Sequence, residues 1–251
     1  MQLDLSGKRV LVTGSSRGIG KVIAEVLHSE GCRVALNARG KDDLMRAVTA
    51  VPGSAAIAGD VSEPDEAVRV VAEAVATLGG LDILVCNVGS GRSVAPGNET
   101  HAEWNRVLAI NLLSATSCVQ AARKALAGSG GAVVCVSSIC GLEVVPGAPV
   151  TYSVAKAGLH AYVRGIALPL GKEGIRINAV AAGNILFDGS VWSQKLAQDA
   201  SAVSAMLERD VALKRLGAPH DVAQLVAYLA SPRAGFATGG VWTLDGGQVR
   251  S

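Results

Sequence analysis

Tyr152 and Lys156 are two side chains that could move a proton, and they lie four residues apart. Residues 152–171 carry a helical pattern, and in a helix this spacing places both side chains on one face. A free tyrosine has a pKa of about 10, which is too high for efficient proton transfer at neutral pH. We expect the Lys156 ammonium to lower the pKa of Tyr152, so that its hydroxyl can donate a proton to a carbonyl oxygen or accept one in reverse.

Ser138 follows a predicted strand at 132–136. Its hydroxyl could hydrogen-bond the same carbonyl oxygen and stabilise the negative charge that develops there. Taken alone, Tyr152 and Lys156 could equally form a surface pair, and Ser138 could be a strand-end turn residue. Cys140, two residues beyond Ser138, could line the same pocket or be an inert packed cysteine. The motifs around these residues favour the catalytic interpretation.

A glycine-rich segment, 13–20, lies between the first predicted strand and the first predicted helix. Glycines at this place let the backbone turn tightly and approach a pyrophosphate, and the helix N-terminus offers unpaired N–H groups. The strand–turn–helix context strengthens a glycine pattern that is weak by itself. The predicted nucleotide contacts in this segment are Gly14, Ser16, Arg17, Gly18, Ile19 and Gly20.

The same segment also fits G-x-S-x-G, the nucleophile elbow of a serine hydrolase, with Ser16 as the nucleophile. A hydrolase of this kind needs an acid and then a histidine further along the chain, whereas His220 comes directly before Asp221. An elbow on the first strand would also have no strand before it. The nucleotide-binding interpretation is therefore preferred.

The end of the second predicted strand distinguishes between the two nicotinamide cofactors. An acidic residue there would hydrogen-bond the adenosine ribose of NAD. The chain has Arg39 instead, with no carboxylate before Asp42. Arg39 and Arg17 could pair with a 2′-phosphate through their planar guanidinium groups. This pattern predicts NADP(H) as the cofactor, with the adenine expected beside Asp60 and Val61.

Short apolar runs, each followed by a helical pattern, repeat along the chain. The predicted strands are 9–13, 33–37, 55–58, 82–86, 132–136, 176–181 and 241–244. The predicted helices are 19–29, 42–51, 63–78, 100–126, 152–171 and 219–230. This alternation implies crossover connections and a parallel sheet, and therefore an α/β protein. No linker divides residues 1–251, so we predict a single domain, with a long irregular substrate loop at about 183–211 or a helical excursion at a subunit contact.

The composition argues against several classes of protein. Of 251 residues, 49% are hydrophobic and 18% are charged, and the net charge is +2, so neither a disordered chain nor a nucleic-acid-binding protein is expected. A membrane span and a signal peptide are not expected either, which predicts a cytoplasmic protein. The five cysteines lack metal-ligand spacing, so we expect reduced thiols and no metal. The four histidines are expected at solvated or capping positions.

Further motifs give the chain a resemblance to the short-chain dehydrogenase/reductase family, over essentially its whole length. With the glycine-rich segment they comprise Asn87-Val88-Gly89, Asn111, Ser138, Tyr152-Ser153-Val154-Ala155-Lys156, Thr238-Gly239-Gly240 and Asp245-Gly246-Gly247. The resemblance implies a Rossmann-type doubly wound sheet of seven parallel strands. It also implies the strand order 3-2-1-4-5-6-7, with helices on both faces.

The resemblance also implies roles for individual residues. Asn111 would hold a water that links Lys156 to solvent as a proton relay, and Lys156 would bind the nicotinamide ribose. The further cofactor contacts that it implies are Asn87, Gly89, Tyr152, Gly183 and Ile185. Members of the family form dimers or tetramers through the helices that carry Asn111 and Tyr152, so a homodimer or homotetramer is expected.

The chain departs from the family pattern beside the expected nicotinamide site. The family usually has Pro-Gly after the sixth strand, where this chain has Ala182-Gly183. A threonine that contacts the nicotinamide carboxamide is replaced by Phe187. The loop between Ser138 and Tyr152 is also one residue longer than in the family, and it borders the active site.

Together these features predict an NADPH-dependent carbonyl reductase that acts on a small molecule. Apolar residues are expected to line the substrate site and favour a 3-oxoacyl or other lipophilic substrate: Val144, Val145, Ile185, Phe187, Val191, Trp192 and Met206. The segment 126–131 lacks basic residues that would hold an acidic carrier protein. The alternatives are an NAD-dependent alcohol dehydrogenase of the same fold and a non-catalytic nucleotide-binding scaffold.

Overall fold

A computed structural model describes residues 2–250 of the chain. Seven parallel strands form one sheet in the order β3-β2-β1-β4-β5-β6-β7. The strands are β1 Arg9–Val12, β2 Arg33–Ala38, β3 Ala55–Ala58, β4 Ile83–Cys86, β5 Ala132–Ser138, β6 Arg176–Ala182 and β7 Val241–Leu244. The predicted seven-stranded Rossmann-type sheet and its strand order are therefore confirmed.

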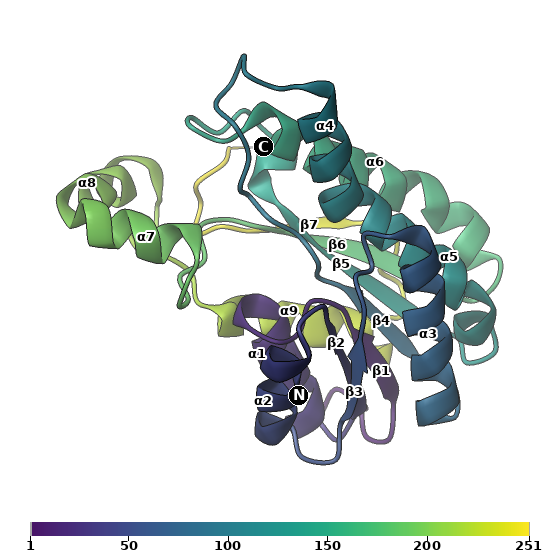
Figure 1. The fold of residues 1–251 in the computed structure, drawn as a ribbon. Helices are drawn as coiled ribbons and strands as arrows, with labels where there is room; N and C mark the ends of the chain where they lie inside the picture. Colours follow the sequence, from purple (N-terminus) through teal and green to yellow (C-terminus); the bar gives the residue numbers. More distant parts are fainter. Residues whose placement is uncertain (1, 251) are drawn as a thin grey trace.

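Helices cover both faces of the sheet (Figure 1). One face packs against α1 Gly18–Ser29, α2 Lys41–Ala50 and α9 Pro219–Ala230. The other face packs against α3 Pro64–Leu78, α5 Ser114–Ala127 and α6 Val150–Gly171, and α4 His101–Leu108 lies against α6. Within residues 2–250, no helix is long and apolar enough to cross a membrane.

Side chains alternate between the two faces of the sheet along each strand, and they form one hydrophobic core on each face. In β1, Val10 and Val12 face the α1 side, while Leu11 faces the α3 side. On α1, Ile23 and Leu27 are fully buried one helical turn apart. Burying an aliphatic side chain of this size contributes roughly 1.5–3 kcal/mol. Strands covered on both faces are apolar throughout, which is why the sequence shows them as continuous apolar runs.

The helix predicted at 100–126 is interrupted in the structure. A π-helical turn, Ala109–Leu113, separates α4 from α5 and contains Asn111. The Asn111 amide donates to the carbonyl oxygen of Val107 at 3.1 Å. A side chain that donates to a backbone carbonyl oxygen competes with the backbone N–H group that would bond to it in a regular helix. π-Helical turns of this kind often occur at functional sites.

Of the two alternatives for residues 183–211, the irregular loop is wrong and the helical excursion is correct, while its place at a subunit contact stays a prediction. Two helices lie there, α7 Val191–Gln198 and α8 Ala200–Asp210, and they stand apart from the two helical layers (Figure 1). Side chains cap both helices, since Ser190 accepts from the N–H of Ser193 and Asp199 accepts from that of Ala202. Neither helix has an extended buried face, so no clear apolar period marks it in the sequence.

Candidate active site

The predicted site residues lie where neighbouring strands end. The glycine-rich segment follows β1, and Asn87 and Gly89 follow β4. Ser138 is the last residue of β5, and Gly183 directly follows β6. Because the strands are parallel, these residues meet at one edge of the sheet, which is the usual ligand edge of an open α/β fold.

The glycine-rich segment packs tightly against the end of β4. The Asn87 amide donates to the carbonyl oxygens of Thr13 at 3.1 Å and of Gly14 at 3.0 Å. A side-chain carbon on Gly20 would collide with both this amide and the Gly14 carbonyl. Glycine is therefore required at residue 20 for its close approach to the Asn87 side chain and the Gly14 backbone, while the predicted contact with a pyrophosphate stays a prediction.

The start of α1 has the features of an anion site. Arg17 is the N-cap residue, yet its side chain makes no capping hydrogen bond, and among the described residues of the first turn none is acidic. The first N–H groups of a helix have no acceptor within the helix and attract negative charge. The glycine-rich segment therefore fits a pyrophosphate group.

The end of β2 carries no carboxylate, in keeping with the sequence. Arg39 there is 75% exposed, and its Nη1 atom lies 3.4 Å from a carboxylate oxygen of Asp60. Burial raises the pKa of Asp60, but hydrogen bonds from Ser62 together with the Arg39 charge outweigh it and leave the pKa below its usual value. Val61, next to Asp60, is buried.

The two arginines predicted to bind a 2′-phosphate have different neighbours. Arg39 pairs with Asp60. Arg17 instead lies beside Gly189, and its Nη1 atom is 3.4 Å from the position that a Cβ atom on Gly189 would take. Arg17 is exposed at the N-terminus of α1. Arg39 is thus the arginine that stands at the end of β2.

Ser138, Lys156 and Asn111 gather around the ends of β4 and β5. All three side chains are buried. The Lys156 Nζ donates to the carbonyl oxygen of Val136 at 3.1 Å, and the Ser138 hydroxyl accepts from the N–H of Cys140 at 3.2 Å. A side-chain carbon on Gly89 would stand 3.1 Å from the Asn111 Oδ1 atom and 3.2 Å from the Lys156 Nζ atom. The absence of a side chain at Gly89 therefore lets Asn111 and Lys156 approach the backbone closely.

Tyr152 is half-buried near the start of α6, and Lys156 Nζ lies 5.8 Å from the centre of its ring. Burial raises the pKa of Tyr152 to about 12, and the nearby Ser138 hydroxyl only partly opposes this. Burial likewise lowers the pKa of Lys156 to about 8. The expectation that Lys156 lowers the pKa of Tyr152 is therefore wrong for the protein alone, because desolvation dominates for both groups. A tyrosine with this pKa remains a proton donor at neutral pH.

Asn111 ties the loop after β4 to the π-helical turn. Its Oδ1 atom accepts from the N–H of Ser90 at 2.8 Å, and its Nδ2 atom donates to the Ser90 carbonyl oxygen at 3.2 Å. This two-way contact fixes the loop backbone beside Lys156. The water relay that the family resemblance implies for Asn111 stays a prediction.

His160 is a buried residue that the sequence does not single out. Its Nε2 atom lies 2.7 Å from the Ser137 hydroxyl, and its Nδ1 atom lies 3.2 Å from the carbonyl oxygen of Gly141. The tautomer that donates through Nδ1 and accepts through Nε2 satisfies both contacts. His160 therefore holds the chain on either side of Ser138, and the expected solvated or capping position is wrong for this histidine.

A second unpredicted contact secures the residue before Tyr152. Thr151 is fully buried, and its hydroxyl lies 2.6 Å from that of Ser93, which donates to Glu103 at 2.7 Å. Hydrogen bonds from Arg106 and Ser93 lower the pKa of Glu103 to about 2. This chain of contacts fastens the loop after β4 to the start of α6. Serine and threonine are common in loops, so nothing in the sequence distinguishes these two.

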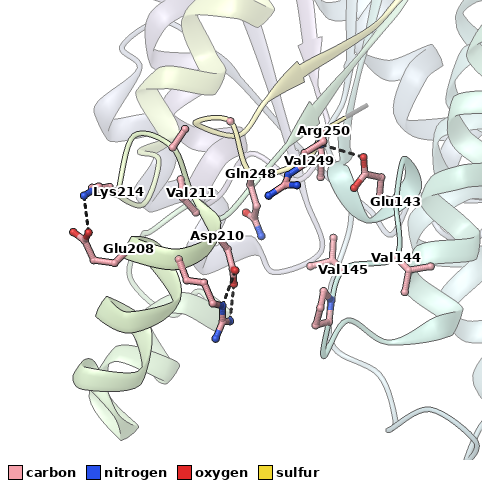
Figure 2. Close-up of a pocket in the computed structure, with 14 residues that line it drawn as sticks. Glu143, Val144, Val145, Glu208, Asp210, Val211, Lys214, Gln248, Val249 and Arg250 are labelled. Atoms are coloured by element: carbon pink, nitrogen blue, oxygen red, sulfur yellow. Dashed lines mark hydrogen bonds and ion pairs between the residues drawn. The ribbon is translucent and has the colours of Figure 1, made fainter.

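A cavity of about 750 Å³ opens between the loop before α6, the end of α8 and the C-terminal segment (Figure 2). Val144 and Val145 line it together with the polar residues Glu143, Gln248 and Arg250. The remaining predicted wall residues do not join them. Trp192 and Met206 line a separate pocket of about 240 Å³, Ile185 is buried, Val191 does not line either pocket, and Phe187 packs against Gly18. Neither cavity is lined by Ser138, Tyr152 or Lys156, so the apolar wall of the substrate site stays a prediction.

Comparisons with known proteins identify the family of the chain. A family profile described as Enoyl-(Acyl carrier protein) reductase matches residues 14–248, which is nearly the whole chain. The chain belongs to the short-chain dehydrogenase/reductase family. Members of this family are oxidoreductases that act on carbonyl or alcohol groups with a nicotinamide cofactor. The family predicted from the motifs is thereby confirmed.

Relatives within the family differ in substrate. L-rhamnose 1-dehydrogenase (NAD(P)(+)) from Sphingomonas sp. is 38% identical over 97% of this chain and 96% of its own. The 3-oxoacyl-[acyl-carrier-protein] reductase FabG of Staphylococcus epidermidis is 36% identical over 96% of this chain and 98% of its own. The structure of L-sorbose reductase from Gluconobacter frateurii, complexed with NADPH and L-sorbose, matches all of both chains with a TM-score of 0.93 and 27% identity.

Proposed function

We propose that the protein is an NADPH-dependent carbonyl reductase in which Tyr152 is the proton donor. The observation that carries the proposal is the cluster of Ser138, Tyr152 and Lys156 at the end of β5, next to a glycine-rich segment that fits a pyrophosphate. The bound nicotinamide would supply a hydride to the carbonyl carbon. As that happens, the neutral Tyr152 hydroxyl gives its proton to the carbonyl oxygen, and the Ser138 hydroxyl stabilises the charge on that oxygen.

The proposed cofactor site comprises the glycine-rich segment and the ends of four further strands. Lys156 would hold the nicotinamide ribose, and the relay water of Asn111 would return the proton that Tyr152 gives up. The residues proposed to contact the cofactor are Gly14, Ser16, Arg17, Gly18, Ile19, Gly20, Arg39, Asp60, Val61, Asn87, Gly89, Tyr152, Lys156, Gly183 and Ile185.

The choice of NADPH over NADH rests on Arg39. Its guanidinium is exposed, and its Asp60 partner is 3.4 Å away, so it can turn to a 2′-phosphate. We expect R39A to weaken NADPH binding about tenfold, or about 1.4 kcal/mol, while the Kd for NADH stays unchanged. Titration calorimetry measures both constants. An equal Kd for NADH and NADPH in the unaltered protein would favour the NAD-dependent alcohol dehydrogenase instead.

The substrate is proposed to be a ketone with both an apolar and a polar part. The predicted 3-oxoacyl or lipophilic substrate accounts for Val144 and Val145, but Glu143 and Gln248 offer hydrogen bonds to a more polar molecule. Oxidation of NADPH, followed by its absorbance, would test 3-oxoacyl thioesters, cyclic ketones and ketoses side by side. Cofactor binding without turnover of any of them would favour the non-catalytic scaffold.

We also propose that the protein forms a homodimer or homotetramer through α4, α5 and α6. Leu113, at the end of the π-helical turn, and Val154 and Leu168 on α6 are exposed apolar side chains. These exposed side chains on neighbouring helices could be covered by a partner subunit. Residues 1–251 as a single domain and the cytoplasmic location stay predictions.

A further inference from the structure

The ring of Phe187 lies on the glycine-rich segment. A side-chain carbon on Gly18 would stand 2.6 Å from the ring Cε2 atom and 2.9 Å from Cδ2 and Cζ, so the ring is in direct contact with the backbone of Gly18. Gly18 is the first residue of α1, where the N–H groups have no acceptor within the helix. The ring therefore covers part of the surface to which a pyrophosphate would bind.

Hydrogen bonds hold the backbone of Phe187 in this place. The N–H of Leu186 donates to Gly217 at 2.8 Å, and Ile185 forms a parallel bridge with the same glycine. On the other side, the N–H of Ser190 donates to the Phe187 carbonyl oxygen at 3.0 Å. The buried Ser190 hydroxyl also accepts from the N–H of Phe187 and from that of Ser193 in α7. The position of the ring is thus linked to the start of α7.

We infer that the Phe187 ring and the dinucleotide compete for Gly18, so that Phe187 sets the affinity of the protein for its cofactor. The inference rests on the proposed function, because the competitor is the pyrophosphate of a nicotinamide dinucleotide. An aromatic ring cannot replace a phosphate oxygen as an acceptor for backbone N–H groups. When only a fraction of the molecules has the ring away from Gly18, the apparent Kd rises by the inverse of that fraction.

This competition acts on a group that both cofactors share. NADPH and NADH have the same pyrophosphate and differ only at the 2′-phosphate. Removal of the ring is therefore expected to tighten the binding of both cofactors by the same factor. Loss of Arg39, in contrast, is expected to change the binding of NADPH alone. The two effects can be told apart with the same two titrations.

The first test compares F187A and F187L with the unaltered protein by titration calorimetry. We expect F187A to lower the Kd for NADPH and for NADH about tenfold, with a smaller effect for F187L, which keeps part of the apolar bulk. The chain has only one other phenylalanine, the exposed Phe236, so F236A is a matched control and is expected to bind as the unaltered protein does. Thermal unfolding of each variant shows whether it is folded.

The second test follows the ring itself. Protein labelled with 4-fluorophenylalanine gives two ¹⁹F resonances, which F236A assigns. Saturating NADPH is expected to shift the Phe187 resonance to the position of a solvent-exposed ring and to leave that of Phe236 in place. An unmoved Phe187 resonance, or a Kd that is unchanged or higher in F187A, would overturn the inference. If neither the unaltered protein nor F187A binds a dinucleotide, the proposed function fails as well.

Discussion

Burial decides the chemistry of the central side chains. Tyr152 and Lys156 lie on one face of α6, as their spacing predicts, but desolvation raises the pKa of one and lowers that of the other. Both shifts favour the neutral form of the group. The Tyr152 hydroxyl is therefore protonated at neutral pH in the protein alone.

Replacement of Tyr152 by phenylalanine tests its role directly. Y152F keeps the ring and removes only the hydroxyl that donates the proton, so we expect kcat to fall by about 10²–10⁴. Y162F, on the same helix, is the matched control and is expected to keep kcat within about twofold. Steady-state kinetics with the ketone that the unaltered protein reduces fastest measure kcat for both variants. Near-normal turnover by Y152F would exclude Tyr152 as the donor.

His160 makes stability depend on pH. Burial lowers its pKa to about 4, so the unfolded chain takes up a proton at a higher pH than the folded protein. The contribution of His160 to the free energy of unfolding is therefore fully present above pH 6.5. It decreases by up to about 3 kcal/mol as the pH falls toward 4. Urea unfolding at a series of pH values measures this loss.

The variant H160Q separates this titration from other groups. Glutamine can still accept from Ser137 and donate to Gly141, but it does not titrate. We expect H160Q to flatten the dependence of stability on pH between 6.5 and 4, while H101Q, at an exposed histidine, leaves it unchanged. A curve for H160Q as steep as that of the unaltered protein would show that other groups cause the acid sensitivity.

At the scale of elements, short contacts between loops and helices shape the site. The loop after β4 is held by Asn111 from the π-helical turn and by Thr151 at the start of α6. The loop has no secondary structure of its own over 87–100. Its position beside Tyr152 therefore depends on these few hydrogen bonds.

The Thr151–Ser93 hydrogen bond can be removed without a change in volume. T151V is expected to lower the free energy of unfolding by about 1 kcal/mol, and to expose the loop at 87–100 to proteolysis, because a buried hydroxyl contact is lost. T151S should restore both properties. T49V, at an exposed threonine on α2, should change neither. Equal proteolysis of T151V and the unaltered protein would show that other contacts hold the loop.

At the scale of the whole molecule, the exposed side of α6 is the proposed subunit contact. A charge at Leu168 would have to be buried in that contact, so L168E is expected to convert a dimer or tetramer into smaller species. V68E, at an exposed valine on α3, is the control and should leave the mass unchanged. Sedimentation measures the mass of both. An L168E protein of unchanged mass would place the contact elsewhere.

The sequence by itself determined the strands and the residues at their ends, and the family resemblance implied the strand order. Apolar strand runs, glycines at tight turns and the Tyr152–Lys156 spacing are local patterns, and local geometry dictates them. The tertiary structure alone decided the contact of Phe187 with Gly18, the burial of His160 and the high pKa of Tyr152. Each of these features depends on contacts between residues far apart in the chain or on the exclusion of water from a group. The spacing of residues along the sequence does not encode such contacts or the exclusion of water.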